Sequence, residues 1–109
     1  MGVLSGLQKF EAPVLAWWCA HGYAICNPDP RGSYHSEGDI RWWSRFEGQD
    51  YHDLIECLGV QDWCNGKVGT CGNSWLAISQ WFAAAEQPPH LAAIAPWEGM
   101  SDIYRDFIL

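Results

Sequence analysis

The sequence predicts an α/β fold with a parallel sheet, and three observations lead to this prediction. Short apolar segments with strand character alternate along the chain with segments whose apolar residues recur at helical spacing. The strand candidates are separated by helices, not by tight turns, so neighbouring strands are expected to run in the same direction. With 49% hydrophobic residues in 109, we expect at most one domain, with a sheet covered on both faces.

The first half of the chain contains one helix, one strand and a long loop. Residues 13–22 are expected to form a short helix that a proline opens and a glycine closes. Residues 23–27 (YAICN) are the first strand candidate. Two X-Pro steps within 27–30 then force an extended chain. Residues 31–48 are polar, glycine-rich and aperiodic, which is typical of a long and often functional loop.

The second half begins with an amphipathic helix from Gln49. Its apolar face consists of four residues at helical spacing, Tyr51, Leu54, Ile55 and Leu58. The Asn65-Gly66 pair then signals a turn into a second strand at 67–71.

The alternation continues to the end of the chain. The next helix is expected to start directly after Ser74 and to end before the proline pair at 88–89. A third strand is expected at 91–95, and Ser101 is expected to cap a final helix.

Composition excludes several classes of function. A net charge of −7 without a Lys/Arg cluster argues against a nucleic-acid partner. No apolar run reaches about 18 residues, so we expect no membrane span. The first ten residues lack a secretory signal, which makes a cytoplasmic location the expectation. Five cysteines, none at zinc-site spacing, are expected to be reduced and buried, with no metal and no cofactor.

Ser74 lies where a strand turns directly into a helix. A nucleophile elbow places serine on such a strained turn, with small residues two before and two after it to relieve crowding. Gly72 fills the first position, whereas Leu76 fills the second and the small residue, Ala77, comes one later. The N–H of Trp75 would point toward an oxyanion beside the hydroxyl. The pattern alone leaves two interpretations open, a catalytic nucleophile or an ordinary N-cap serine.

The chain resembles the CocE/NonD acyl hydrolases, which belong with the X-Pro dipeptidyl-peptidases in the α/β-hydrolase fold. The resemblance covers nearly everything from about residue 7 to residue 106, and the matching segments are collinear: HGYAICNPDPRGSYHSEG, EGQDYHDLIECLGVQDWCNGKVG, CGNSWLAISQW and HLAAIAPWEGMSDIYRD. The family tolerates a bulky residue at Leu76 with a small one at Ala77, so the resemblance favours Ser74 as the nucleophile and Trp75 as its backbone oxyanion donor.

The resemblance also implies what to expect beyond these residues. The whole chain, 1–109, is expected to be part of an α/β-hydrolase catalytic domain, without the early strands, the lid and the C-terminal part. The triad acid, the triad histidine and a tyrosine oxyanion donor are expected outside it. In relatives with α-aminoacyl substrates, an acid matching Asp102 helps to hold the substrate ammonium, although a helix-terminal role fits Asp102 equally well. Trp97 is expected in an acyl pocket or in the core.

Other polar residues are expected to have structural roles. Asp29 and Arg31, in a stretch shared with the family, suggest a buried Arg–carboxylate arrangement that fixes the loop. His90 precedes the third strand, at the end of the sheet opposite Ser74, and is a poor general base. The remaining histidines fall on positions typical of surface residues: His21, His35 and His52.

The resulting expectation is a serine hydrolase that cleaves an ester or an X-Pro peptide through an acyl-serine intermediate. Its partner is a small-molecule ester or peptide substrate, and the oligomeric state stays open. The alternative is a catalytically incomplete fragment or a binding module that lacks the triad acid and histidine.

Overall fold

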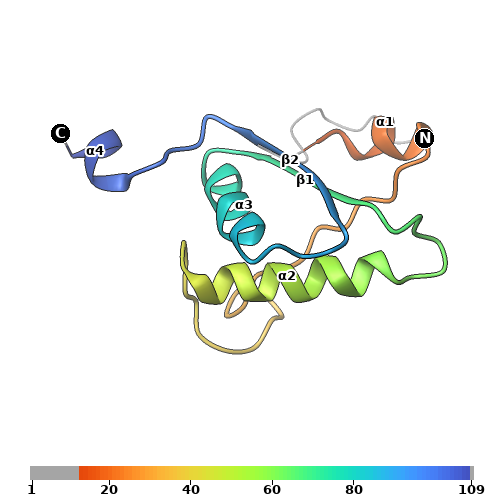
Figure 1. Cartoon of the computed structure of the whole chain (residues 1–109), viewed down its shortest axis with the longest axis horizontal. Helices are drawn as coiled ribbons and strands as arrows, with labels where there is room; N and C mark the ends of the chain where they lie inside the picture. Colours follow the sequence, from red (N-terminus) through yellow and green to blue (C-terminus); the bar gives the residue numbers. More distant parts are fainter. Residues whose placement is uncertain (1–12, 109) are drawn as a thin grey trace.

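The computed structural model describes residues 13–108, so the expectations for the first ten residues lie outside the described part. Figure 1 shows the elements, which follow one another in this order: α1 (Leu15–Ala20), α2 (Arg45–Gly59), β1 (Val68–Asn73), α3 (Trp75–Ala85), β2 (Leu91–Trp97) and α4 (Ile103–Phe107). Among these residues no helix is both long and apolar enough to cross a membrane.

The centre of the structure is the unit β1–α3–β2. The two strands pair in parallel, with Thr70 opposite Ile94 and Asn73 opposite Trp97. The predicted α/β class with parallel strands is thus confirmed, and both strands extend two residues beyond the expected ends. Because β1 and β2 run parallel, with α3 as the crossover between them, the C-terminal ends of both strands lie at the same edge of the sheet. Ser74 directly follows β1 at this edge.

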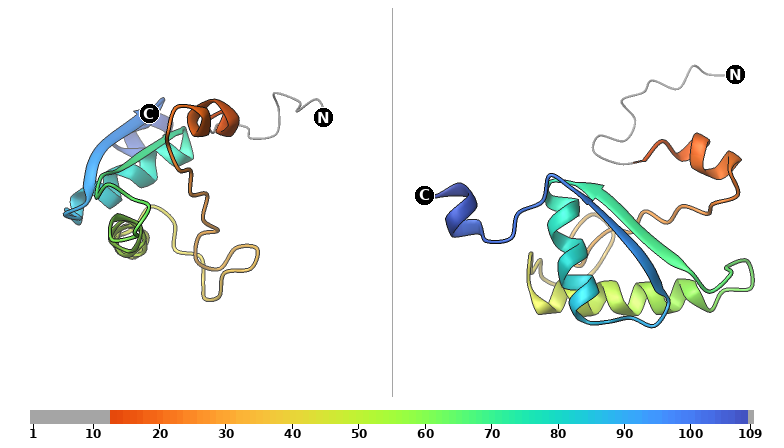
Figure 2. Two further views of the ribbon diagram at one scale, coloured as in Figure 1. Left: turned by 90° about the vertical axis from the view of Figure 1, so that its right-hand side faces the viewer. Right: turned by 45° about the horizontal axis from the view of Figure 1, so that its top comes forward.

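The expectation that helices cover both faces of the sheet is wrong for the described residues. α3 packs on β1 and β2, and α2 packs mainly on α3, so both helices lie on one side of the strand pair (Figures 1 and 2). α1 lies away from α2 and packs extensively against no other element. Among the described residues no helix packs extensively on the opposite face of the sheet, and Cys71 of β1 is exposed.

The strand expected at 23–27 is not formed. These residues have no regular secondary structure, and almost all of them are exposed. A strand is stable only beside a hydrogen-bonded neighbour, and the described sheet contains only β1 and β2. Residues 23–27 therefore lack the neighbour that a strand requires among the described residues.

Helix α2 begins at Arg45, four residues earlier than its apolar periodicity predicts. The Glu47 carboxylate accepts a hydrogen bond from the Trp43 N–H at 2.6 Å, just before the N-cap residue Ser44. This contact resembles a capping box, in which a glutamate in the first turn satisfies a free N–H at the helix start. The Ser-x-x-Glu pattern at 44–47 is the sequence signal for this earlier start.

The core is small and lies between α2, α3 and the strands. Its buried apolar side chains are Ile55, Ala77, Ile78 and Ala83. The predicted apolar face of α2 is confirmed, since Ile55 is buried and its three partners are half-buried. The cysteines were expected to be buried, and this is wrong: Cys64 is half-buried and the other four are exposed, all as free thiols.

We expect the isolated chain to be marginally stable and prone to association. The outer edge of β1 has no strand partner among the described residues, and such an edge offers free N–H and C=O groups to other chains. Unpaired backbone groups that become buried cost about 1–3 kcal/mol each, against a typical domain stability of about 5–15 kcal/mol. Thermal melting with hydrogen exchange and light scattering tests this. A sharp two-state transition of a monomer above about 60 °C would contradict it.

Candidate active site at the Ser74 turn

Ser74 adopts a strained backbone conformation, with φ 55° and ψ −116°. Non-glycine residues rarely occupy this region, and holding one there costs on the order of 1–3 kcal/mol. The Ser74 N–H donates to the carbonyl oxygen of Trp97 at 2.9 Å, and the Ser74 carbonyl accepts from Ala77 and Ile78 in the first turn of α3. Hydrogen bonds on both sides therefore hold the strained residue, and its side chain is left at the surface.

Small residues around the turn make this conformation possible. A Cβ atom on Gly72 would lie 2.4 Å from the Cβ of Leu76, so only glycine fits two residues before the serine. A Cβ atom on Gly99 would lie 3.2 Å from the Cβ of Ala77, which is completely buried. Both positions after the serine are thus constrained: the Cβ of Leu76 lies against Gly72 although Leu76 is 40% exposed, and Ala77 is buried against Gly99.

The geometry of Ser74 differs from that of an ordinary N-cap serine. An N-cap residue has extended backbone angles, and its side chain accepts a hydrogen bond from the first turn of the helix. Ser74 has positive φ and makes no such bond. The N–H of Trp75, the first residue of α3, has no partner within the helix. It is directed toward the space in front of the helix, where a negatively charged oxygen would be stabilised.

Trp97 and Asp102 lie at and after the C-terminal end of β2. Trp97 ends the strand, contacts the turn through its carbonyl and has a 67% exposed side chain, so it is not a core residue. Asp102 is the N-cap of α4, and its Oδ1 accepts from the N–H groups of Tyr104 and Arg105 at 2.9 and 3.1 Å. The expected cap, Ser101, instead donates its N–H to Asp106, because the helix starts one residue later.

An open groove of about 1040 Å³ lies between α3 and the segment that follows β2. Its walls are mostly apolar and include Trp43, Ile78, Trp81 and Phe82, with Asp102 among the polar residues. Ser74 is not a lining residue of this groove. Asp102 therefore lies at the apolar groove and not against the Ser74 backbone. The residue that contacts the Ser74 backbone is Trp97.

An aromatic cluster covers the start of α3, and the sequence analysis did not identify it. The ring centroid of Trp75 lies 4.4 Å from that of Trp42 and 4.7 Å from that of Trp43. Glu47 anchors this cluster, since it accepts from the Trp43 N–H and, at 2.7 Å, from the Ser79 hydroxyl of α3. The sequence signals were the adjacent tryptophans at the end of the polar loop and the capping pattern after them.

No histidine hydrogen-bonds the Ser74 hydroxyl within the described part of the chain. The His90 side chain contacts Glu56 at 2.7 Å, at the opposite end of β2 from Trp97, as expected. His21 contacts the Trp17 carbonyl, and His52 contacts Asp53. Residues 13–108 likewise hold no group of three or more His, Cys, Asp or Glu side chains with the arrangement of a metal site.

Comparison with known proteins identifies the family. Residues 5–109 match the X-Pro dipeptidyl-peptidase (S15 family). The chain belongs to this S15 family. It is 39% identical over 84 residues to the cocaine esterase of Rhodococcus sp. (strain MB1 Bresler), an alignment that covers 77% of this chain and 14% of that protein. The chain therefore spans about a seventh of the length of this curated relative.

Solved structures support the same assignment. Two crystal structures of a CocE/NonD family hydrolase from Staphylococcus aureus superimpose on this chain. One gives a TM-score of 0.79 at 37% identity and covers 95% of this chain and 19% of that one. The other gives 0.67 at 49% identity, with coverages of 70% and 14%. The structure is consistent with a partial α/β-hydrolase fold of the CocE/NonD type.

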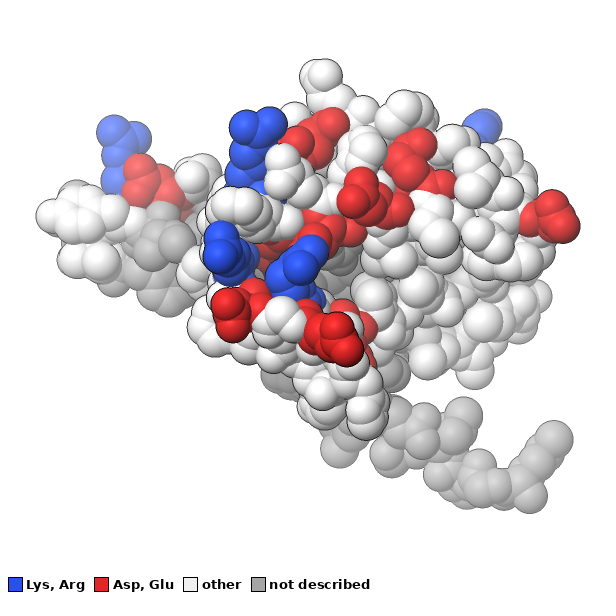
Figure 3. Space-filling model, turned by 90° about the horizontal axis from the view of Figure 1, so that it is seen from below, with Lys and Arg blue, Asp and Glu red and all other residues white. Residues whose placement is uncertain are grey.

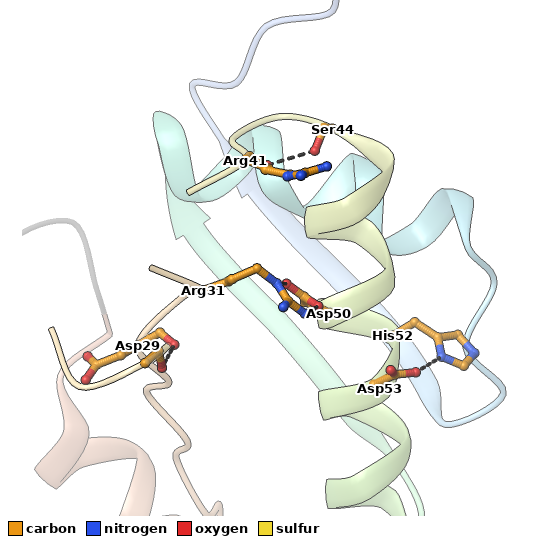
Figure 4. A network of polar contacts seen from close by, with 8 residues as sticks. Asp29, Arg31, Arg41, Ser44, Asp50, His52 and Asp53 are labelled. Atoms are coloured by element: carbon orange, nitrogen blue, oxygen red, sulfur yellow. Dashed lines mark hydrogen bonds and ion pairs between the residues drawn. The ribbon is translucent and has the colours of Figure 1, made fainter. Parts of the chain in front are cut away.

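The stretch DPRG, residues 29–32, fixes the long loop onto α2. Arg31 donates two parallel hydrogen bonds to the Asp50 carboxylate, one of them at 2.7 Å from Nε (Figure 4). The expected Arg–carboxylate pair is thus present, but it is not buried, because the two side chains are 52% and 37% exposed. Asp29 is not part of it; its carbonyl accepts from the Ser36 hydroxyl.

Acidic and basic side chains are interspersed on the face of the molecule that carries α2 (Figure 3). Arg31 pairs with Asp50, and Arg45 pairs with Glu86 at 3.2 Å. The guanidinium of Arg41 lies 4.5 Å from the centre of the Phe46 ring. The mixed signs give this face no continuous positive field of the kind that attracts nucleic acid.

Two carboxyl groups make the S15 chain sensitive to acid. Hydrogen bonds from Arg31 lower the pKa of Asp50, and the hydrogen bond from the His90 N–H, followed by the contact with its ring, lowers the pKa of Glu56. A lowered folded-state pKa adds stability above the unfolded pKa and loses it as pH falls through the folded value. We expect the free energy of unfolding to decrease below about pH 4.

Denaturant melts at about pH 6 and about pH 3 measure this decrease. Glu56→Gln and Asp50→Asn are each expected to weaken the pH dependence. Asp62 is an exposed acid that pairs with no basic side chain of residues 13–108, and Asp62→Asn provides the control variant. The explanation would be wrong if all three variants kept the pH dependence of the unchanged chain.

Proposed function

We propose that Ser74 is the nucleophile of a serine acyl hydrolase of the S15 and CocE/NonD type. The chain would supply the nucleophile turn of an α/β-hydrolase catalytic domain. The observation that carries the proposal is the conformation of Ser74, strained at φ 55° between β1 and α3 with an exposed side chain. Strain of this kind persists only where the surroundings enforce it, and it clusters at catalytic sites.

The chemistry is acyl transfer to water through an acyl-serine. The Ser74 oxygen attacks the substrate carbonyl carbon, forms a C–O bond and passes its proton to a base. The carbonyl oxygen becomes negative and accepts a hydrogen bond from the Trp75 N–H. Collapse expels the alcohol or amine, which takes up the proton. Water then attacks the acyl carbonyl and passes a proton to the base, and the second collapse releases the acid and returns the proton to the Ser74 oxygen.

The substrate is proposed to be an ester or an X-Pro peptide. Trp97 would contact the acyl group. Its own carbonyl accepts the hydrogen bond from the Ser74 N–H, and its ring is exposed beside the turn. Asp102 would attract a substrate ammonium, which an X-Pro dipeptidyl substrate has and a simple ester lacks. One of its carboxylate oxygens, Oδ2, makes no hydrogen bond with the described residues.

A binding module without turnover is the second candidate. It is favoured by one observation: no histidine contacts the Ser74 hydroxyl in the described part of the chain. A nucleophile without its base loses roughly 10⁴-fold or more in rate, although oxyanion stabilisation leaves some catalysis. The two candidates differ in whether any turnover depends on Ser74.

Turnover of a p-nitrophenyl ester by the purified chain tests the proposal. We expect feeble hydrolysis, far below about 1 s⁻¹, that Ser74→Ala abolishes. Ser101→Ala is the matched control, because Ser101 is also exposed and also follows a Gly-x pair, and it should leave the rate unchanged. Hydrolysis of an Ala-Pro p-nitroanilide under the same conditions compares the two substrate classes.

The possible results separate the candidates. Residual hydrolysis that survives Ser74→Ala would contradict the nucleophile assignment. A Ser74-dependent rate of about 1 s⁻¹ or faster would show that the chain contains a base that we have not identified. A chain that binds the ester without Ser74-dependent hydrolysis would support the binding module.

A further inference from the structure

Gln80 is a fully buried polar residue that links three elements of the site. It lies on the sheet-facing side of α3 with none of its surface exposed. Its Oε1 accepts from the Thr70 hydroxyl of β1 at 3.1 Å and from the Ala95 N–H of β2 at 3.0 Å. Its Nε2 donates to the Leu76 carbonyl at 2.9 Å. One amide therefore joins both strands to the first turns of α3.

The two strands specify their own alignment only weakly. β1 (VGTCGN) contains two glycines, and β2 (LAAIAPW) contains three alanines, so few large side chains interlock across the pair. Their register already shifts between Val68 and Gly69. Register slips are easiest in glycine-rich strands with an open face. The pair thus needs a further contact to fix its alignment.

Gln80 supplies this contact just below the catalytic turn. Thr70 lies four residues before Ser74, and Ala95 lies two residues before Trp97. The Ser74 N–H reaches the Trp97 carbonyl only if β1 and β2 keep their register. A slip by one residue would remove that hydrogen bond and would tilt the Trp75 N–H away from the site of the oxyanion.

We propose that Gln80 is a positioning residue that fixes the register of β1 against β2 and thereby holds the Ser74 turn. Its consequence for hydrolysis rests on the acyl-transfer function proposed above, whereas the register role does not. A leucine would fill a similar volume, but it would leave the Thr70 hydroxyl and the Ala95 N–H without their acceptor. The amide is thus required for alignment as well as for filling the core.

Hydrogen exchange resolved by NMR tests the register role. The readout is the exchange rate of the Ser74 N–H, which does not contact Gln80, relative to that of the Ile55 N–H in α2, which reports global opening. Gln80→Leu is expected to raise this ratio about tenfold or more. Ser79→Ala is the matched control. Ser79 is the neighbouring buried polar residue of α3, and its hydroxyl donates to Glu47 and to the Trp75 carbonyl within α3 but not to the strands, so the ratio should stay within about twofold.

In the Gln80→Glu variant a change of pH is expected to restore the contacts of Gln80. This variant tests the register role even if the leucine variant does not fold. A buried glutamate has a raised pKa, so at about pH 5 its neutral acid can still accept from the strands and donate to Leu76. At about pH 8 the carboxylate could still accept, but it cannot donate to the Leu76 carbonyl, and the cost of its buried charge moves the side chain away from the strands. The ratio should therefore be normal at the lower pH and raised at the higher one, while the unchanged chain shows no such difference.

The proposal is overturned if neither Gln80 variant changes the ratio, or if Ser79→Ala changes it equally. Ester hydrolysis by the same variants separates this proposal from the proposed function. If Ser74-dependent hydrolysis exists, Gln80→Leu should lower it about tenfold or more, and by more than Ser79→Ala does. If the unchanged chain shows none, the hydrolase assignment fails, and the exchange ratio still decides the role of Gln80.

Discussion

The close approach of α3 to the strand pair determines the position of every other part of the site. Small residues make it possible, because Ala77 and Ala83 are completely buried and leave room for the backbones to come together. The turn that joins β1 to α3 must then be sharp, and the whole change of direction falls on Ser74. A longer connection would relieve the strain, but it would also move the serine away from the helix N-terminus.

This tight connection has energetic consequences for the rest of the chain. Strain at Ser74 must be offset by contacts elsewhere, yet the described core contains only four buried apolar side chains. Polar contacts therefore hold much of the assembly together. Glu47 connects α2 to α3, Gln80 connects α3 to the strands, and Glu56 connects α2 to the start of β2. The contact with His90 lowers the pKa of Glu56, so the structure is expected to loosen in acid before the turn itself changes.

The sequence predicted the elements around Ser74 well because their signals are local. The helix after Ser74 and the strands before and after it depend on periodicity and on proline positions, and all are present. The strand expected at 23–27 failed because a strand requires a partner, which no local pattern reveals. The same holds for the cysteines, since their burial depends on which faces of the sheet are covered.

The turn at Ser74 was predicted from its residues, but the residues that hold the turn in place were not. Gly72 suggested the elbow, whereas the role of Gly99 becomes visible only when the segment after β2 packs against Ala77. Gln80 appeared on no predicted apolar face, because an amide in the core is recognised only from its partners. Residue patterns thus identified the reactive group, and three-dimensional contacts identified the residues that hold it.

Covalent trapping of the nucleophile tests the central claim most directly. The purified chain is incubated with a fluorophosphonate, and peptide mass spectrometry locates the adduct. The geometry predicts that Ser74 is phosphonylated, slowly, in preference to every other exposed serine, and that Ser74→Ala removes the modification. An adduct distributed equally over the exposed serines, or one placed on Ser101, would contradict the account.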